Sequence, residues 1–252
     1  MGTVPDEAEA RREWLTRWGA EQEQRMREAE RRRVAALAAR AMSGLARAPK
    51  RLVGASAQLA NRVLDRGLQT SGGLSLPEYH RAYRLGYVSS AWYVLPRALW
   101  YLGVSDRDTF VDFGCGKGRV VHQAARRPFR RVIGVEISPA LAEIARAAVS
   151  ARKHQHRCRD VEIVVADAGE FRIPDDLTIG YFFHPFSGNT LVEVLRGIVD
   201  SIDRNPRRVR LIFAVPHAGS LVLATGRFRV LTVHRALPGD RGYGRTAIFE
   251  SC

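Results

Sequence analysis

The stretch "VDFGCGKGRV", residues 111–120, joins the end of an apolar run to a turn rich in glycine. Asp112 closes the apolar run, and Gly114 and Gly116 follow at alternate positions. Glycine permits a tight turn and a close approach of the backbone to a ligand. Gly118 opens a predicted helix, and the backbone N–H groups at such a start attract negative charge. The stretch therefore predicts a strand, a ligand-binding loop and a helix.

The spacing of the glycines narrows the choice of ligand. A P-loop requires Ser or Thr after its lysine, but Lys117 is followed by Gly118. A dinucleotide site has the pattern G-x-G-x-x-G, whereas this loop has G-x-G-x-G with an acid two residues before it. A carboxylate there would repel a pyrophosphate and attract a cation. This pattern fits S-adenosylmethionine, which carries an ammonium and a sulfonium group.

Apolar strands and helices alternate on both sides of the loop. We predict strands at 109–113, 131–136, 161–167, 178–183 and 208–215, and helices at 90–102, 118–127, 139–152 and 189–202. This alternation is typical of βαβ units, whose parallel sheet is covered on both faces. Segments 227–234 and 244–250 are expected to form a hairpin at one edge. The predicted fold class is α/β.

Three further features carry a resemblance to a known family. Glu136 ends the second strand, Asp167 ends the third, and "FFHPF" at 182–186 ends the fourth. Together with the glycine loop they resemble the class I S-adenosylmethionine-dependent methyltransferases, in particular bacterial members with a VDFGCGKGRV-like loop and an NPF-like motif. The resemblance implies a Rossmann-like, seven-stranded sheet. It also implies S-adenosylmethionine as cofactor and in-line methyl transfer that needs no metal.

The resemblance also implies roles for single residues. Glu136 is expected to accept hydrogen bonds from both ribose hydroxyls, and an ordinary strand-end carboxylate is the alternative. Asp167 and the backbone of Ala168 are expected to meet the adenine edge, and a turn-forming aspartate is the alternative. The expected cofactor-binding set is Asp112, Phe113, Gly114, Cys115, Gly116, Gly118, Glu136, Ile137, Asp167, Ala168 and His184.

The end of the fourth strand is where the methyl acceptor is expected. The expected catalytic residues are His184, Pro185 and Phe186. Relatives that methylate nitrogen have Asn or Asp where this chain has His184. Histidine can act as a general base near neutral pH and asparagine cannot; the alternative is a histidine that only bonds the backbone. Trp92 and Tyr93 are candidates for lining the pocket, or else simply core.

The positive net charge of the chain favours anionic partners but does not indicate which class of partner binds. The 252 residues carry a net charge of +14, and lysine occurs only at positions 50, 117 and 153. The charge is spread along the chain, so it does not imply a dedicated groove. The three cysteines lack metal-ligand spacing and indicate free thiols in a reducing compartment. No signal-like or membrane-length apolar run is present, and we expect a cytoplasmic protein.

The amino-terminal part differs in composition from the rest. We predict a helical extension and linker at 1–74 and the methyltransferase domain at 75–252. Apolar residues recur at helical spacing between 34 and 45, opposite a face of arginines. This helix either packs on its own domain or contacts a membrane surface or partner through 31–48.

The predicted activity is methyl transfer to a nitrogen or oxygen nucleophile, with a small molecule or a protein as the favoured acceptor. One alternative is a silent module that binds S-adenosylmethionine and regulates, which the histidine at 184 motivates. RNA methylation and an NAD-dependent oxidoreductase are the others. No metal is expected, since His154 and His156 near Cys158 gather no further ligand.

Overall fold

The strands form one mixed sheet. The computed structural model describes residues 89–183, 186, 188–215, 218–235 and 245–252. Its seven-stranded sheet has the order β3-β2-β1-β4-β5-β7-β6. The five strands β1 to β5 run parallel, and β7 is antiparallel to both of its neighbours. The strands are β1 Thr109–Phe113, β2 Arg131–Glu136, β3 Asp160–Val165, β4 Leu177–Phe182, β5 Arg210–Ala214, β6 Phe228–Arg235 and β7 Arg245–Ser251.

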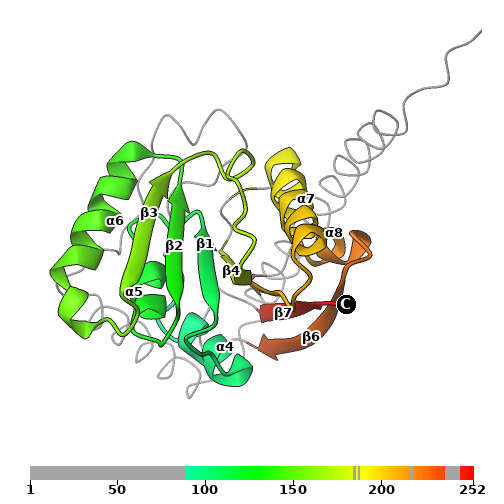
Figure 1. Cartoon of the computed structure of the whole chain (residues 1–252), viewed down its shortest axis with the longest axis horizontal. Coiled ribbons are helices and arrows are strands. Elements are labelled where there is room, and N and C mark those ends of the chain that lie inside the picture. Colours follow the sequence, from blue (N-terminus) through cyan, green and yellow to red (C-terminus); the bar gives the residue numbers. More distant parts are fainter. Residues whose placement is uncertain (1–88, 184–185, 187, 216–217, 236–244) are drawn as a thin grey trace, which may run out of the picture.

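Helices cover both faces of the sheet (Figure 1). They are α4 Val94–Leu102, α5 Arg119–Ala125, α6 Pro139–Ala151, α7 Asn189–Arg204 and α8 Gly219–Ala224, with a 3-10 turn, η1, at Lys153–Gln155. One apolar cluster joins α4, α5 and α6 to the sheet, and a second joins α7 and α8 to its other face. The predicted three-layered α/β architecture is confirmed. Of the helices in the described segments, none is both long and apolar enough to cross a membrane.

Local sequence explains where α6 begins and how closely it approaches the glycine loop. Ser138 caps the helix by accepting a hydrogen bond from the Leu141 N–H, and Pro139 occupies the first helical position. A Cβ added to Gly118 would lie 3.0 Å from the Cβ of Ala145, and Gly118 has a φ of +79°. The third glycine of the loop is thus required both for its backbone conformation and for helix packing.

Several predicted boundaries were wrong, and some predictions fall outside the described residues. Strand β3 ends at Val165 rather than at residue 167, so Asp167 lies in the turn beyond it. Strand β5 spans only Arg210–Ala214, and α8 and η1 were not predicted. The hairpin at the sheet edge is confirmed as β6 and β7. The extension at 1–74, the contact segment 31–48 and the domain boundary lie outside the described residues.

The strand order places a crevice at one edge of the sheet. From β1 the chain moves outward to β2 and β3, and then returns to place β4 on the other side of β1. In open α/β sheets ligands bind at the carboxyl ends of the strands where the order reverses in this way. Asp112 and Tyr181 are register partners close to this end of β1 and β4. The topology therefore leads to the loop at 114–118 as the ligand site.

Gly134, in the middle of β2, packs closely against the glycine loop and α5. A Cβ on Gly134 would lie 2.7 Å from Val121 Cγ2, 2.8 Å from Cys115 Sγ and 2.9 Å from Ile163 Cδ1. We expect Gly134→Ala to lower the free energy of unfolding by about 1–3 kcal/mol, because it overpacks the contact between sheet, loop and α5. Denaturant unfolding of the variant and of the original chain measures this loss of stability. Gly169→Ala is the control, since its Cβ would make only ordinary contacts from 3.6 Å outward. Equal stability of the two variants would contradict the prediction.

Candidate active site

The glycine loop folds back over the end of β2. Gly114, Gly116 and Gly118 have φ values of 80°, 55° and 79°, a region that other residues rarely adopt. The backbone N–H groups of Gly114 and Cys115 both donate to the carbonyl oxygen of Val135, each at 2.9 Å. The predicted tight turn is therefore present directly after β1, at the carboxyl edge of the sheet.

Glu136 ties this loop to the start of α6. Its side chain is only 2% exposed. Oε2 accepts a hydrogen bond from the Gly116 N–H at 2.8 Å, and Oε1 accepts one from the Ser138 N–H at 3.0 Å. The carboxylate thus organises the backbone around the site. Its expected contact with ribose hydroxyls stays a prediction.

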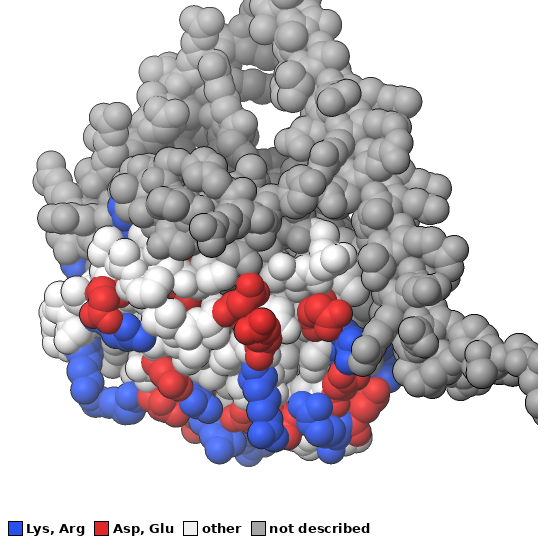
Figure 2. Space-filling view, turned by 90° about the horizontal axis from the view of Figure 1, so that it is seen from above, with Lys and Arg blue, Asp and Glu red and all other residues white. Residues whose placement is uncertain are grey.

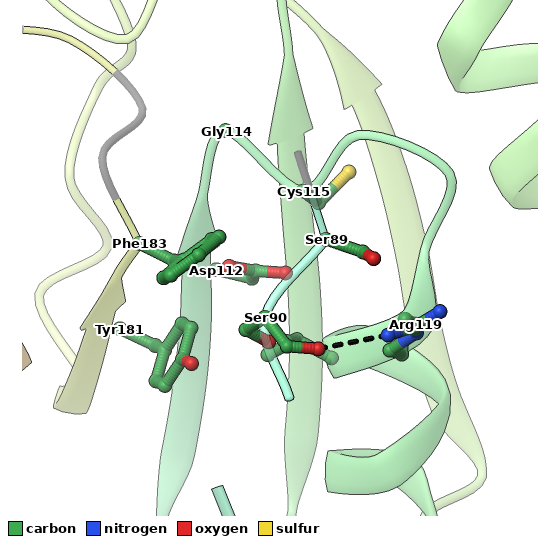
Figure 3. Close-up of a pocket in the computed structure, with 9 residues that line it drawn as sticks. Ser89, Ser90, Asp112, Gly114, Cys115, Arg119, Tyr181 and Phe183 are labelled. Atoms are coloured by element: carbon green, nitrogen blue, oxygen red, sulfur yellow. Dashed lines mark hydrogen bonds between the residues drawn. The ribbon is translucent and has the colours of Figure 1, made fainter. Parts of the chain in front are cut away.

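A hollow of about 280 Å³, counting the space at its open side, lies where β1 and β4 separate (Figure 3). Sequence reasoning had singled out Asp112, Gly114 and Cys115 but missed the other lining residues. Two signals were present: Arg119 belongs to the opening motif itself, and Phe183 is the second aromatic of "FFHPF". The described residues that line the hollow are Ser89, Ser90, Asp112, Gly114, Cys115, Arg119, Val120, Tyr181 and Phe183.

The electrostatics of the hollow favour a cation beside Asp112. This side chain is 3% exposed. Burial raises the pKa of its carboxyl well above the ordinary value, and the nearby charge of Glu136 raises it further. Burial also raises the pKa of the Cys115 thiol, with smaller contributions from the same two carboxyl groups. A bound cation would stabilise the ionised carboxylate of Asp112, which burial deprives of hydration.

Helix α5 holds the segment that forms one wall of the hollow. Arg119 Nη1 donates to the carbonyl oxygen of Ser90 at 2.8 Å, and Gln123 Nε2 donates to that of Trp92 at 2.9 Å. The Arg119 guanidinium lies 5.3 Å from the centroid of the Trp92 ring. Trp92 is buried in this packing, and Tyr93 packs against the core beside it. Neither side chain lines the hollow. Of the two roles considered for Trp92 and Tyr93, the structure therefore fits packing in the core.

Two histidines, His122 in α5 and His156, lie next to each other, and His122 also contacts Trp92. His122 Nδ1 lies 3.0 Å from His156 Nε2, and the His122 ring meets Trp92 edge to face. Burial and, to a smaller extent, the neighbouring His156 lower the pKa of His122 to about 4, and burial also lowers the pKa of His156. Both rings are therefore neutral at neutral pH. Within the described segments, no group of three or more His, Cys, Asp or Glu residues could hold a metal ion.

The aromatic residues near the end of β4 divide between the two faces of the sheet. Phe113, Phe182 and Phe213 stack at centroid distances of 4.7 and 4.4 Å within the cluster that α7 covers. Phe186 packs edge to face on Phe182 at 6.4 Å and joins the same cluster. Phe183 packs on the opposite face and lines the hollow. Phe113 and Phe186 therefore anchor the core with their side chains.

The residues expected around adenine and ribose lie at the same edge of the sheet. The Ala166 N–H donates to the carbonyl oxygen of Glu136 at 3.0 Å. Asp167 Oδ1 accepts from the Gly169 N–H at 3.0 Å, which is the turn-forming role given as its alternative. Ala168 is buried and Ile137 half-buried. The roles of these residues in cofactor binding stay predictions. His184 and Pro185 lie outside the described residues.

Comparison with known proteins finds a family model that matches part of the chain. Residues 110–205 match the family model described as methyltransferase domain. No curated protein sequence matches the chain. A candidate RNA methyltransferase from Pyrococcus horikoshii has a similar fold, with a TM-score of 0.50, 17% identity, and coverage of 77% of this chain and 96% of that one.

Two further structures are similar at lower scores. An RNA methyltransferase from Salinibacter ruber, in complex with S-adenosyl-L-homocysteine, aligns with a TM-score of 0.44, 22% identity, and coverage of 65% of this chain and 92% of that one. A precorrin-6y C5,15-methyltransferase from Geobacter metallireducens aligns with a TM-score of 0.48, 17% identity, and coverage of 70% and 99%.

The donor set of the hollow fits the cofactor of this family. The Ser90 hydroxyl is buried and has no hydrogen-bond partner in the described part of the chain, and the Asp112 carboxyl is buried beside it. A ligand with a cationic end and hydrogen-bonding groups suits both. The chain therefore contains a segment, from β1 to α7, that matches a methyltransferase domain, and its sheet order and glycine loop agree with the fold of class I methyltransferases, which use S-adenosylmethionine.

Proposed function

We propose that the chain transfers a methyl group from S-adenosylmethionine to a nitrogen or oxygen atom of a small molecule or a protein side chain. The observation that carries this proposal is the hollow at the switch point between β1 and β4, lined by Asp112, Ser90 and Phe183. When bound, the cofactor supplies a methyl group activated by a positively charged sulfur.

The residues of the chain would act by binding and orientation. Asp112 offers a buried carboxyl to the cationic part of the ligand, and the loop fixed by Glu136 sets where that ligand rests. Phe183 gives the hollow an aromatic wall, which would limit the entry of water when the ligand is bound. Alignment of donor and acceptor in such a site supplies much of the acceleration of a transfer reaction. His184, the next residue along the chain, is proposed as the group that takes the acceptor's proton.

Surface charge supports a small-molecule or protein acceptor over RNA. Strong binding to nucleic acid relies on clustered basic side chains that meet phosphates. Figure 2 shows basic and acidic side chains interleaved on the described part of one face. Among the described residues, several arginines pair with acids at 2.7 Å, as in Arg131–Glu162, Arg204–Asp175 and Arg227–Asp203. Each pair neutralises its arginine locally, so these arginines do not form a free basic patch.

The test follows the methyl group. The full chain is incubated with methyl-labelled S-adenosylmethionine and a cell extract, which is then separated into small molecules, protein and RNA. We expect label in the small-molecule or protein fraction. Label confined to RNA would overturn the proposed acceptor, and no label with normal cofactor binding would favour the silent module. A thermal shift with NAD and none with S-adenosylmethionine would overturn the activity itself.

The role proposed for His184 is tested with two substitutions. His184→Ala should lower the rate of label transfer while cofactor affinity stays within about threefold, because a base acts on the acceptor and not on the cofactor. Asparagine can position an amine but cannot take its proton. Recovery in His184→Asn would therefore indicate positioning of a nitrogen acceptor. Transfer at the normal rate in both variants would contradict any catalytic role.

A further inference from the structure

We infer that Arg97, Arg235 and Arg245 form a site for an anionic group, a carboxylate or a phosphate, carried by the methyl acceptor. These three residues are called the anion site below. The inference rests on the proposed function, because it assigns a charge to the acceptor of that reaction. The anion site lies outside both the hollow and the matched segment 110–205.

Two arginines face each other at one end of the β6–β7 hairpin. Arg235 is the last residue of β6, Arg245 is the first of β7, and the two are register partners. Both residues are exposed, and neither pairs with an acid in the part of the chain that the structure describes. Like charges directly opposite each other destabilise a pair of strands. A bound anion would convert this repulsion into attraction.

The other end of the same hairpin shows how the chain balances such charge. There the carboxylate of Glu250 lies 2.8 Å from Arg229 Nη2 and 3.7 Å from Arg208 Nε. Among the described residues, no acid has the corresponding place beside Arg235 and Arg245. The arrangement at this second end therefore favours an anion that comes from outside the described chain.

Arg97 of α4 brings a third cation to this point. Its Nη1 donates to the carbonyl oxygen of Arg235 at 2.8 Å. Tyr101, one turn further along α4, meets the His234 ring edge to face at 5.4 Å. Burial and the charge of Arg97 lower the pKa of His234, so this ring is neutral at neutral pH. The positive charge therefore comes from guanidinium groups, which match carboxylates and phosphates with paired hydrogen bonds.

The sheet places the anion site at the same edge as the hollow. Val215 directly follows β5, which runs parallel to β4, and its N–H donates to the carbonyl oxygen of Arg245 at 2.9 Å. Arg245 thus lies at the carboxyl ends of the parallel strands, where the ligand site is. Phe183 of the hollow packs in the same cluster as α4, on one face of the sheet.

The spacing of the strands limits the size of the acceptor. Strands β5 and β7 separate β4 from β6, and neighbouring strands lie about 4.8 Å apart. The wall of the hollow at β4 and the anion site at β6 are therefore roughly 10–15 Å apart along the sheet. This distance suits an acceptor that extends from its methylated atom to a distant anionic group.

The backbone of Val215 gives a further reason to place a ligand contact here. Its φ is +82°, and it is the one residue other than glycine with a positive φ in the described segments. A branched side chain strongly disfavours this conformation, and such strain is found mainly at functional sites. The hydrogen bond from Val215 to Arg245 is one contact that holds the strained residue in place.

The first experiment uses inorganic phosphate as the probe and needs no acceptor. Thermal unfolding of the full chain is measured while phosphate replaces chloride at constant ionic strength. We expect phosphate to raise the Tm in a saturable manner. Without phosphate, Arg235→Gln and Arg245→Gln should each raise the Tm by about 1–3 °C, because the repulsion is removed. Both variants should weaken phosphate binding about 3- to 10-fold.

Arg229→Gln is the matched control on the same strand. Arg229 is also exposed, but it is paired with Glu250. This variant should not raise the Tm without phosphate, and its phosphate affinity should stay within about twofold of that of the full chain. Absence of a phosphate effect in the unmodified chain would overturn the anion site. Equal phosphate affinities in Arg245→Gln and Arg229→Gln would overturn it as well.

The second experiment links the anion site to the acceptor. Transfer of labelled methyl groups is measured against the amount of cell extract added. Arg245→Gln should raise the amount that gives half-maximal labelling about 3- to 10-fold, while the maximal rate and the affinity for S-adenosylmethionine stay within about twofold. Phosphate binding with an unchanged half-maximal amount would overturn the inference, because the site would then bind a free anion. Normal cofactor binding by the full chain without any transfer would instead overturn the proposed function.

Discussion

Replacement of Asp108 by alanine should lower the free energy of unfolding by about 3–5 kcal/mol, because it leaves a buried cation without its partner. Asp108 lies just before β1, at the edge of the sheet opposite the ligand site. Its Oδ1 lies 3.1 Å from Arg210 Nη2, and the two side chains are only 10% and 13% exposed. Arg210 comes from the start of β5, so the pair joins distant parts of the sheet.

Further hydrogen bonds make the Asp108 carboxylate the centre of a network. Oδ2 accepts from the backbone N–H of Ser105 at 2.9 Å and from its hydroxyl at 3.0 Å. Oδ1 also accepts a hydrogen bond at 2.9 Å from the hydroxyl of Thr178, in β4. Removal of the carboxylate would leave all of these donors with one partner fewer in a site that water reaches poorly.

Denaturant unfolding measures the effect, and an exposed ion pair supplies the control. Asp175 pairs with Arg204 at 2.7 Å, but both side chains are nearly half exposed. Exposed pairs contribute little, so Asp175→Ala should cost less than about 1 kcal/mol. Similar losses in the two variants would show that burial does not give the Asp108 network its stabilising effect. Cofactor affinity of the folded Asp108→Ala protein should stay normal, since the hollow lies at the other end of β1.

The sequence predicted the sheet well because its strands are short apolar runs separated by strong turn residues. The limits of β1 and β2 were predicted to the residue. The error at β3 has a physical cause. Val165 is the last residue of β3 paired with β2, opposite Glu136, and Asp167 turns the chain by accepting from the Gly169 N–H. From the sequence alone, an aspartate that accepts a hydrogen bond from the backbone two residues further on cannot be told apart from an aspartate at the end of a strand.

The lining of the hollow was predicted only in part, because it assembles residues distant in sequence. Asp112, Gly114 and Cys115 belong to one motif and could be found by spacing. Ser90 reaches the site only because Arg119 and Gln123 hold the segment before α4 against α5. No periodicity encodes that contact. Phe183 and Phe186 have the same residue type, but they pack on opposite faces of the sheet, and only Phe183 lines the hollow.

Replacement of Asp112 by asparagine should change cofactor binding and stability in opposite directions. The amide keeps the shape of the carboxyl but loses its charge, so affinity for S-adenosylmethionine should fall about 10- to 100-fold, as for a lost hydrogen bond to a charged group. The protein without cofactor should become more stable, because an ionised carboxyl buried beside Glu136 is costly. Sites that trade stability for function behave in this way. Asp106→Asn, in an exposed loop, should change neither property.

The pH dependence of Asp112→Asn gives the sharpest test. The folded pKa of Asp112 lies above that of the unfolded chain, so the folded state holds this proton more tightly. The stabilising contribution is therefore present at low pH and is lost as pH rises from the unfolded value through the folded one. A cationic ligand favours the ionised carboxyl, so binding releases the proton and cofactor affinity rises with pH across the same range. Asp112→Asn should show neither trend in calorimetry and thermal unfolding. If the rise in affinity persists in the variant, another group carries the titration, and Asp112 does not meet the cation.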